Sequence, residues 1–166
     1  RQRQICIRDG AGDEDAMAAF FARLGEESGV AIMLQNAPAP MGIGLGVDAL
    51  LSLATRVPAI RYVKEETMPS GHRITALSER AGDSVEAVFG GAGARYVLDE
   101  LARGAVGTMP ACEITEVHVA MLAAHAAGDP ETARVLFERT LPLLSMQAVF
   151  RWRLTKAVLL LSLIHI

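Results

Sequence analysis

Lysine is rare in this 166-residue chain, and one of its lysines lies where an amine could do chemistry. Of the 16 basic residues, only Lys64 and Lys156 are lysines, and the other fourteen are arginines. Arginine keeps its proton in proteins, whereas an unprotonated lysine amine can attack a ketone and form a Schiff base. Lys64 lies near the end of an apolar segment, where a charge is costly. We therefore expect Lys64 to be a nucleophile and Lys156, on a predicted helix, to lie at the surface.

Lys64 also has a purely structural interpretation. Its amine can form an ion pair with Glu65 or Glu66, or extend into solvent from the strand end. The two glutamates follow the lysine directly, and in an extended strand they point to opposite sides. One of them is a candidate for tuning Lys64 or orienting a loop; otherwise both are solvated or ion-paired.

The elements that position this lysine alternate between strands and helices. The apolar pattern predicts strands over residues 31–34, 60–66, 84–89 and 105–109. It predicts helices over residues 14–28, 48–54, 70–80, 94–102, 113–127 and 130–150, and a last one from Arg153. Asp13, Ser70 and Asp129 are expected to cap three of these helices. A helix, four strand–helix units and further helices are typical of a parallel sheet covered by helices.

Two architectures fit this order: an open doubly wound sheet, or part of a (β/α)8 barrel. In both, ligands bind at the carboxyl ends of the strands. The residues at those ends are Gln35, Asn36, Lys64, Glu65, Glu66, Gly90, Gly91, Met109 and Pro110. These residues are therefore the first candidates for a functional site.

The composition excludes several classes of protein. A chain that is 51% hydrophobic is not disordered as a whole. A formal net charge of −3 argues against a surface for nucleic acid or anionic membranes. The apolar run at residues 157–166 is too short for a bilayer, which needs about 20 residues. Cys6 and Cys112 are expected to be reduced thiols, which favours a cytoplasmic protein.

Metal and cofactor patterns are weak. His118 and His125 are seven residues apart on one predicted helix, which is not the four-residue spacing of a helical metal site. The glycines at 42, 44 and 46 do not have the spacing of a dinucleotide-binding loop. His72, at a predicted helix start, is expected to be an exposed helix residue. These patterns therefore predict neither a helical metal site nor a dinucleotide-binding loop.

Four short segments follow one order and spacing that is known from a family of enzymes. They are Ile-Met-Leu-Gln-Asn-Ala-Pro at 32–38, Tyr-Val-Lys-Glu-Glu at 62–66, Phe-Gly-Gly at 89–91 and Gly-Ala-Val-Gly-Thr-Met at 104–109. Together they resemble the dihydrodipicolinate synthase/N-acetylneuraminate lyase family. Residues 128–134, with Leu-Pro-Leu at 141–143, are similar to that family's carboxy-terminal helices. The resemblance covers residues 12–158.

The resemblance implies an α/β fold, a partial (β/α)8 TIM barrel of strands five to eight, followed by extra carboxy-terminal helices. Lys64 aligns with the lysine that forms a Schiff base with pyruvate or another 2-oxo acid, which permits aldol cleavage or condensation, or dehydration of a 2-keto-3-deoxy acid. Gly90 and Met109 align with positions that line the pocket. The candidate substrate-binding residues are Gln35, Asn36, Glu66, Gly90 and Met109. The resemblance implies no metal and no organic cofactor, and the parent protein is expected to be a homo-oligomer, a tetramer in this family.

The sequence departs from the family pattern at two places. Gln35 occupies the position of a tyrosine that relays protons, and an amide cannot act as an acid or base near neutral pH. Pro40 occupies the position of an arginine that contacts an acidic aldehyde in the synthases. A sugar-acid dehydratase or aldolase therefore fits better than a synthase of lysine biosynthesis. The family's Thr-Thr or Ser-Thr pair, which holds the pyruvate carboxylate, belongs to the half that the resemblance does not cover.

We expect three segments: a poorly defined leading segment at 1–11, a partial barrel with carboxy-terminal helices at 12–150, and a truncated last helix with a non-native tail at 151–166. Three hypotheses follow. The chain is part of a Schiff-base lyase; it is a non-catalytic half-barrel that aggregates or pairs with another half, because its sheet edges are exposed; or it is a binding domain on an open sheet. The third hypothesis predicts that Lys64→Arg loses nothing.

Overall fold

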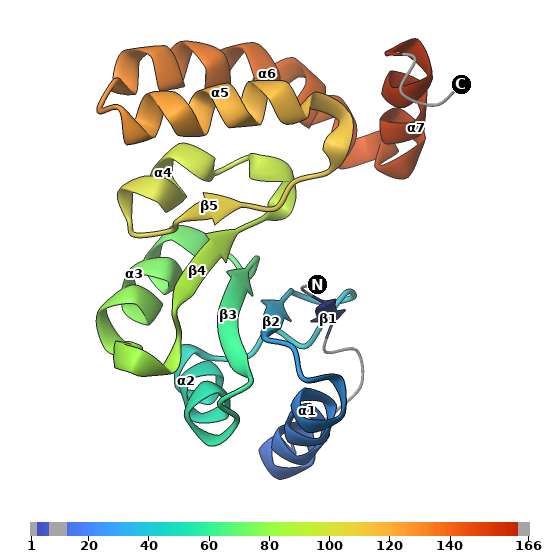
Figure 1. Ribbon diagram of the computed structural model, residues 1–166. Coiled ribbons are helices and arrows are strands. Elements are labelled where there is room, and N and C mark those ends of the chain that lie inside the picture. The colour runs from blue at the N-terminus through green and yellow to red at the C-terminus, as the bar shows by residue number, and fades with distance from the viewer. Residues whose placement is uncertain (1–2, 7–12, 163–166) are drawn as a thin grey trace.

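The computed structural model describes residues 3–6 and 13–162, in which five strands alternate with helices (Figure 1). The strands are β1 (Arg3–Cys6), β2 (Ile32–Asn36), β3 (Ile60–Glu65), β4 (Ala87–Gly90) and β5 (Gly107–Thr108). The helices are α1 (Glu14–Ser28), α2 (Val47–Arg56), α3 (Ser70–Arg80), α4 (Val97–Ala102), α5 (Thr115–Ala126), α6 (Pro130–Phe150) and α7 (Trp152–Leu161). Short 3-10 turns, η1 (Gly82–Ser84), η2 (Ala92–Ala94) and η3 (Cys112–Ile114), lie in the connections.

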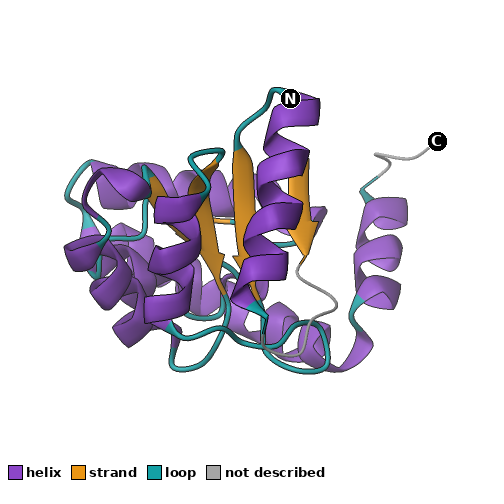
Figure 2. Cartoon of the chain, turned by 90° about the horizontal axis from the view of Figure 1, so that it is seen from below, coloured by secondary structure: helices purple, strands orange, loops and turns teal. Residues whose placement is uncertain are grey.

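The five strands form one parallel sheet in the order β1-β2-β3-β4-β5. An open doubly wound sheet reverses its strand order at a switch point, whereas a (β/α)8 barrel adds its strands one after another. No reversal occurs among the described strands, so the order favours part of a barrel over the open sheet. Figure 2 shows the strands side by side with helices packed along them.

The first strand is a correction to the sequence analysis, which predicted no element before α1. Residues Arg3–Cys6 pair in parallel with Ile32–Gln35 of β2. The segment is only four residues long and half of it is polar, so it has no apolar run that would predict a strand. Its conformation depends on hydrogen bonds to β2, which a local pattern does not reveal.

The main apolar core lies between one face of the sheet and helices α1, α2 and α3. Leu34 of β2, Ile60 of β3 and Val88 of β4 pack in one cluster with helix residues such as Phe21 and Leu50. Burying a side chain of this size contributes about 1.5–3 kcal/mol. This packing fixes one face of each strand, so the alternate residues of the strands point to the other face.

The predicted helix ends are largely confirmed. The Asp13 side chain accepts hydrogen bonds from the N–H groups of Asp15 and Ala16, at 3.0 and 3.2 Å, and α1 ends at Gly29 in the left-handed conformation. Asp129 caps α6 through the N–H of Thr132. The prediction for Ser70 is wrong, because Pro69 is the cap of α3 and the Ser70 hydroxyl turns inward to Glu100.

The carboxy-terminal helices form a separate layer beside β5 and α4. Helices α5 and α6 lie side by side, and α7 turns away after Arg151 (Figure 1). Their small core joins Val97 and Leu101 of α4 with Met121 of α5 and Ala133 of α6. Among the described residues, no helix has the length and apolarity needed to cross a membrane. Of the tail predicted to be non-native, residues 163–166 lie outside the described part of the chain.

Candidate active site

The strand register brings the side chains of Gln35, Lys64 and Phe89 to one face of the sheet. Gln35 of β2 pairs with Lys64 of β3, and Lys64 pairs with Phe89 of β4. Residues in register on neighbouring strands project to the same side. The Phe89 ring meets the ring of Tyr62, two residues before Lys64, edge to face, with the ring centroids 6.3 Å apart. This face is opposite to the one that packs on α1, α2 and α3.

Lys64 lies within a small polar group at the carboxyl end of β3. The residue is 7% exposed, and its Nζ lies 3.3 Å from Oε1 of Glu66. The same carboxylate accepts a hydrogen bond from the Gln35 side-chain amide and one from the N–H of Ala92, at 2.8 Å. Glu66 is thus held by three donors from three separate segments. The ion-pair interpretation of Lys64 is correct for Glu66, and the amine is not exposed to bulk solvent.

Glu65 serves the opposite face of the same strand. It is fully buried, and its carboxylate accepts hydrogen bonds from the Asn36 amide, at 2.9 and 3.1 Å, and from the N–H of Thr67, at 2.6 Å. Arg73 of α3 completes the group, with Nε 3.1 Å from the carboxylate. Burial raises the pKa of Glu65, while the hydrogen bonds from Asn36 and Thr67 and the charge of Arg73 act in the other direction.

Asn36 belongs to this second group rather than to the lysine group. Its side chain is buried, accepts from the N–H of Leu45 at 2.8 Å and donates to the Leu45 carbonyl at 3.1 Å. Arg73 also donates to that carbonyl. Asn36 ties the loop after β2 to β3, on the face opposite to Lys64, because alternate residues of a strand face opposite ways. Its role in substrate binding stays a prediction.

Gly90 and Met109 lie at the ends of the next two strands. The N–H of Met109 donates to the Gly90 carbonyl at 3.1 Å, and the Met109 residue is partly buried. A side chain at Gly90 would collide with the carboxylate of Glu100, which lies buried behind the strand and accepts a hydrogen bond from Ser70 at 2.8 Å. Gly90 therefore contributes only backbone atoms at the carboxyl ends of the strands. Its place near the substrate stays a prediction.

Sequence reasoning missed two contributors to these groups. The N–H of Ala92 reaches Glu66 from the turn after β4, and Arg73 of α3 reaches Glu65. The contact of Ala92 is made by a backbone N–H, which has no sequence signature. Arg73 is one of fourteen arginines, so its residue type does not set it apart. Only their position after or beside a strand end could have drawn attention to them.

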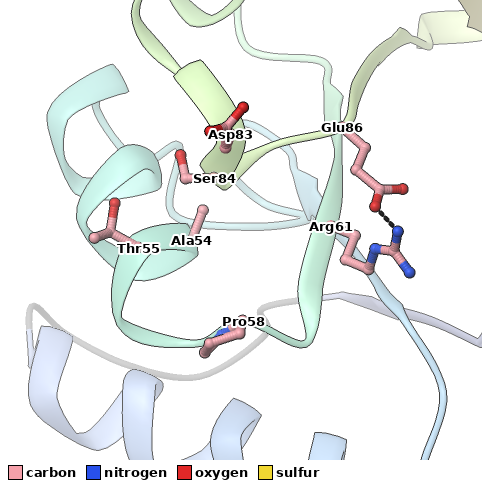
Figure 3. A pocket seen from close by; sticks show the side chains of 7 residues that line it. All are labelled: Ala54, Thr55, Pro58, Arg61, Asp83, Ser84 and Glu86. Carbon is pink, nitrogen blue, oxygen red and sulfur yellow. Dashed lines mark ion pairs between the residues drawn. The ribbon is translucent and has the colours of Figure 1, made fainter.

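A pocket of about 280 Å³ lies at the other end of the sheet (Figure 3). Its lining residues are Ala54, Thr55, Pro58, Arg61, Asp83, Ser84 and Glu86. Arg61 and Glu86 form an ion pair across its edge (Figure 3). Because these residues precede or begin β3 and β4, the pocket is at the amino ends of the strands, where this kind of fold does not place its ligands.

Comparisons with known proteins converge on one family. No protein-family model matches the chain. An L-2-keto-3-deoxyarabonate dehydratase of Azospirillum brasilense is 29% identical over 126 residues, which is 76% of this chain and 40% of the dehydratase. A proposed dihydrodipicolinate synthetase from Pseudomonas aeruginosa has 28% identity and a TM-score of 0.75, over 89% of this chain and 50% of that one. The chain is therefore similar to members of the dihydrodipicolinate synthase/N-acetylneuraminate lyase family over about half of their length.

A further solved structure shares the fold of this chain. The sialic acid aldolase of Ruminococcus gnavus matches with a TM-score of 0.78 at 16% identity, over 95% of this chain and 52% of the aldolase. The chain spans 40% of the curated relative and about half of the solved structures that it matches. The partial barrel expected from the sequence is confirmed, and the dihydrodipicolinate synthase/N-acetylneuraminate lyase family is a family of lyases.

Proposed function

We propose that this chain carries the Schiff-base lysine of a lyase that acts on a 2-oxo acid, and that Lys64 is its nucleophile. The carrying observation is the buried Lys64 amine, 3.3 Å from the Glu66 carboxylate, at the carboxyl end of a parallel strand. Carboxyl ends of strands are where this architecture places reacting groups. Lys156, by comparison, is exposed on α7.

The chemistry of such an amine on a 2-oxo acid is defined. The neutral Lys64 amine adds to the keto carbon, and the carbonyl oxygen leaves as water to give a protonated imine. This imine accepts the electron pair released when a proton leaves the neighbouring carbon, or when a carbon–carbon bond to that carbon breaks. In a 2-keto-3-deoxy acid, loss of the proton at carbon 3 and of the hydroxyl at carbon 4 then amounts to dehydration.

Glu66 is the side chain placed to move the protons that this sequence requires. Its carboxylate contacts the Lys64 amine and can accept a proton from it. Gln35 cannot exchange protons near neutral pH, but its amide donates a hydrogen bond that orients the Glu66 carboxylate. We infer that the Glu66 carboxylate and the Gln35 amide together do the work that a tyrosine does in the family pattern.

The substrate that fits best is a sugar-derived 2-keto-3-deoxy acid. Pro40 stands where the synthases have an arginine for an acidic aldehyde, so that contact is absent here. The curated relative is named as a dehydratase of 2-keto-3-deoxyarabonate, which supports dehydration over condensation. No cofactor or metal is part of this proposal. The parent protein is proposed to be a homo-oligomer.

Borohydride trapping tests the proposal directly. The protein expressed from its complete gene is incubated with pyruvate and sodium borohydride, and its peptides are analysed by mass spectrometry. We expect a reduced pyruvate adduct on Lys64 and none on Lys156. Folded protein that gives no adduct at saturating keto acid would overturn the assignment of Lys64.

A second candidate function is a non-catalytic half-barrel, in keeping with the hypothesis drawn from the sequence. The described sheet ends in two edge strands, β1 and β5, and the chain spans about half of the related structures. Unpaired sheet edges promote association. Light scattering of the purified 166-residue chain distinguishes the two: large or mixed assemblies favour this candidate, and a monomer with a sharp melting transition counts against it.

A further inference from the structure

The turn after β4 has an unusual backbone conformation at the point where it meets the lysine group. Ala92, Gly93 and Ala94 all have positive φ angles, 50°, 71° and 64°. Residues with a side chain rarely adopt this region, so two alanines in it need support from their surroundings. The N–H of Ala92 donates to Oε1 of Glu66 at 2.8 Å. The strained turn therefore supplies one of the three donors that hold Glu66 against Lys64.

Arg95 ties this turn to α6. One of its guanidinium nitrogens, Nη1, donates to the Ala92 carbonyl at 2.8 Å. A second nitrogen, Nη2, donates to the Leu144 carbonyl of α6 at 3.2 Å and lies 3.4 Å from Oε1 of Gln147. The planar guanidinium presents these donors in a fixed geometry. The carbonyl of Ala92 is thus held by α6 through Arg95, while its N–H holds Glu66.

Gln147 of α6 contacts the turn directly as well. Its Oε1 lies so close to Gly93 that a Cβ at that position would collide with it. Its Nε2 donates to Oε1 of Glu113, 2.7 Å away, in the turn after β5. Glu113 is 6% exposed, so this hydrogen bond is shielded from water. The amide is therefore fixed at both ends, and a flip would lose both hydrogen bonds.

We propose that Gln147 is a positioning residue for the lysine site: with Arg95, it holds the 92–94 turn so that the N–H of Ala92 keeps Glu66 against Lys64. This inference rests on the proposed function and extends it to a helix that follows the barrel strands. It assigns α6 a role in proton transfer, since a displaced Glu66 would exchange protons with Lys64 less well. Gln147 itself touches neither substrate nor Lys64.

The test compares Gln147→Leu with Met146→Ala in the protein expressed from its complete gene. Leucine keeps the bulk of glutamine but loses both polar contacts, whereas Met146 is the exposed neighbour on the same helix. A displacement of about 1 Å at reacting groups can cost up to about 10²-fold in rate, so we expect kcat to fall about tenfold in Gln147→Leu. We expect KM for the keto acid to change less than about twofold, because binding groups stay in place. Met146→Ala keeps both constants.

A reciprocal exchange separates positioning from stability. Gln147→Glu alone sets two carboxylates against each other at positions 113 and 147. Combined with Glu113→Gln, it restores the hydrogen bond in the reverse direction and keeps an acceptor for Arg95. We expect a reduced kcat in the single variant and recovery to within about threefold in the double variant. The single and double variants also test the positioning role of Gln147 if Gln147→Leu does not fold.

The borohydride experiment on the unaltered protein distinguishes failure of the proposed function from failure of the positioning role alone. If that protein forms no adduct on Lys64, the proposed function fails, and the positioning role fails with it. If the adduct forms but Gln147→Leu, or the Gln147→Glu and double variants, keep the kcat of the unaltered protein, only the role of Gln147 is overturned. If the Gln147 variants have a lower melting temperature than the unaltered protein but keep its kcat, the contact of Gln147 with the turn is purely structural.

Discussion

Glu65 and Glu66 are adjacent residues of the same type, yet they lie in two different environments. Glu66 faces the side of the sheet that carries Lys64 and Gln35, and its three donors come from the strands and the turn after β4. Glu65 faces the helices, where Asn36, Thr67 and Arg73 surround it. The alternation of a strand separates the two carboxylates within a single residue step.

At the carboxyl end of β3, two residues of one type therefore have two different tasks. The Glu66 group contains the Lys64 amine, the proposed nucleophile, and is built from few side chains. The Glu65 group contains no nucleophile and fixes the loop at Leu45 and the start of the segment after β3. We therefore expect substitutions on the Glu66 face to change turnover and those on the Glu65 face to change stability.

The largest expected effect is the loss of turnover in Lys64→Arg. Arginine keeps the positive charge beside Glu66 but cannot form an imine, since its guanidinium does not lose a proton. We expect turnover of the 2-oxo acid to fall at least about 10³-fold, with no borohydride adduct and little change in melting temperature. Lys156→Arg is the matched control and keeps full activity. Retained turnover in Lys64→Arg would overturn the assignment of Lys64 as the nucleophile.

Glu65→Leu is expected to have the next largest effect, and it acts on stability. Removal of the carboxylate leaves the Arg73 guanidinium, which is 19% exposed at its side chain, without its buried partner. Loss of one partner from a buried ion pair costs about 3–5 kcal/mol, and the partial exposure of Arg73 places the loss near about 3 kcal/mol. Urea unfolding of the complete protein measures it. A loss below about 1 kcal/mol would contradict the assignment of this group.

Glu66→Gln sharpens the comparison from the other face. The amide keeps the shape of the carboxylate and can still accept from the N–H of Ala92, but it cannot take a proton from Lys64. General acid–base groups contribute about 10²–10⁴-fold, so we expect kcat to fall at least about 10²-fold. Unfolding free energy should change by less than about 1 kcal/mol. For Glu65→Gln, measured in parallel, we expect a larger loss of unfolding free energy and a smaller loss of kcat than for Glu66→Gln.

The strands, most helix ends and the lysine were predictable from the sequence for local reasons. Asp13 and Gly29 mark α1 because capping and left-handed ends depend on a few neighbouring residues. Lys64 stood out because lysine is rare here and because it follows an apolar strand. The four family segments then placed Gln35, Gly90 and Met109 at neighbouring strand ends.

What the sequence could not supply depends on contacts between distant segments. The strand at Arg3–Cys6 exists through its pairing with β2. The face of β2 to which Asn36 points could not be predicted, because strand periodicity alone does not say which face is buried, and a shift of one residue moves a side chain to the other side. The N–H of Ala92 and the guanidinium of Arg95 meet their partners only after β4 and α6 are in place.

The smallest expected effect concerns pH and a third carboxylate, Glu100, which lies behind Gly90 on the helix side. Burial raises its pKa above the ordinary value of 4.5, as do the nearby charges of Asp99, Glu66 and Glu65, against a hydrogen bond from Ser70. The folded protein therefore binds this proton more tightly than the unfolded chain does. It follows that the contribution of Glu100 to stability falls as pH rises from about 4.5 through its raised folded-state pKa.

Glu100→Gln removes this titration while its amide oxygen can still accept from Ser70. We expect the unfolding free energy of the variant to decline less between about pH 5 and about pH 8 than that of the unaltered protein, as measured by urea unfolding at several pH values. Part of the decline remains, because burial also raises the pKa of Glu65. Glu79→Gln, at an exposed position of α3, is the control and keeps the original slope. Identical slopes in Glu100→Gln and the unaltered protein would mean that Glu100 titrates alike in the folded and unfolded states, and that its burial has no electrostatic cost.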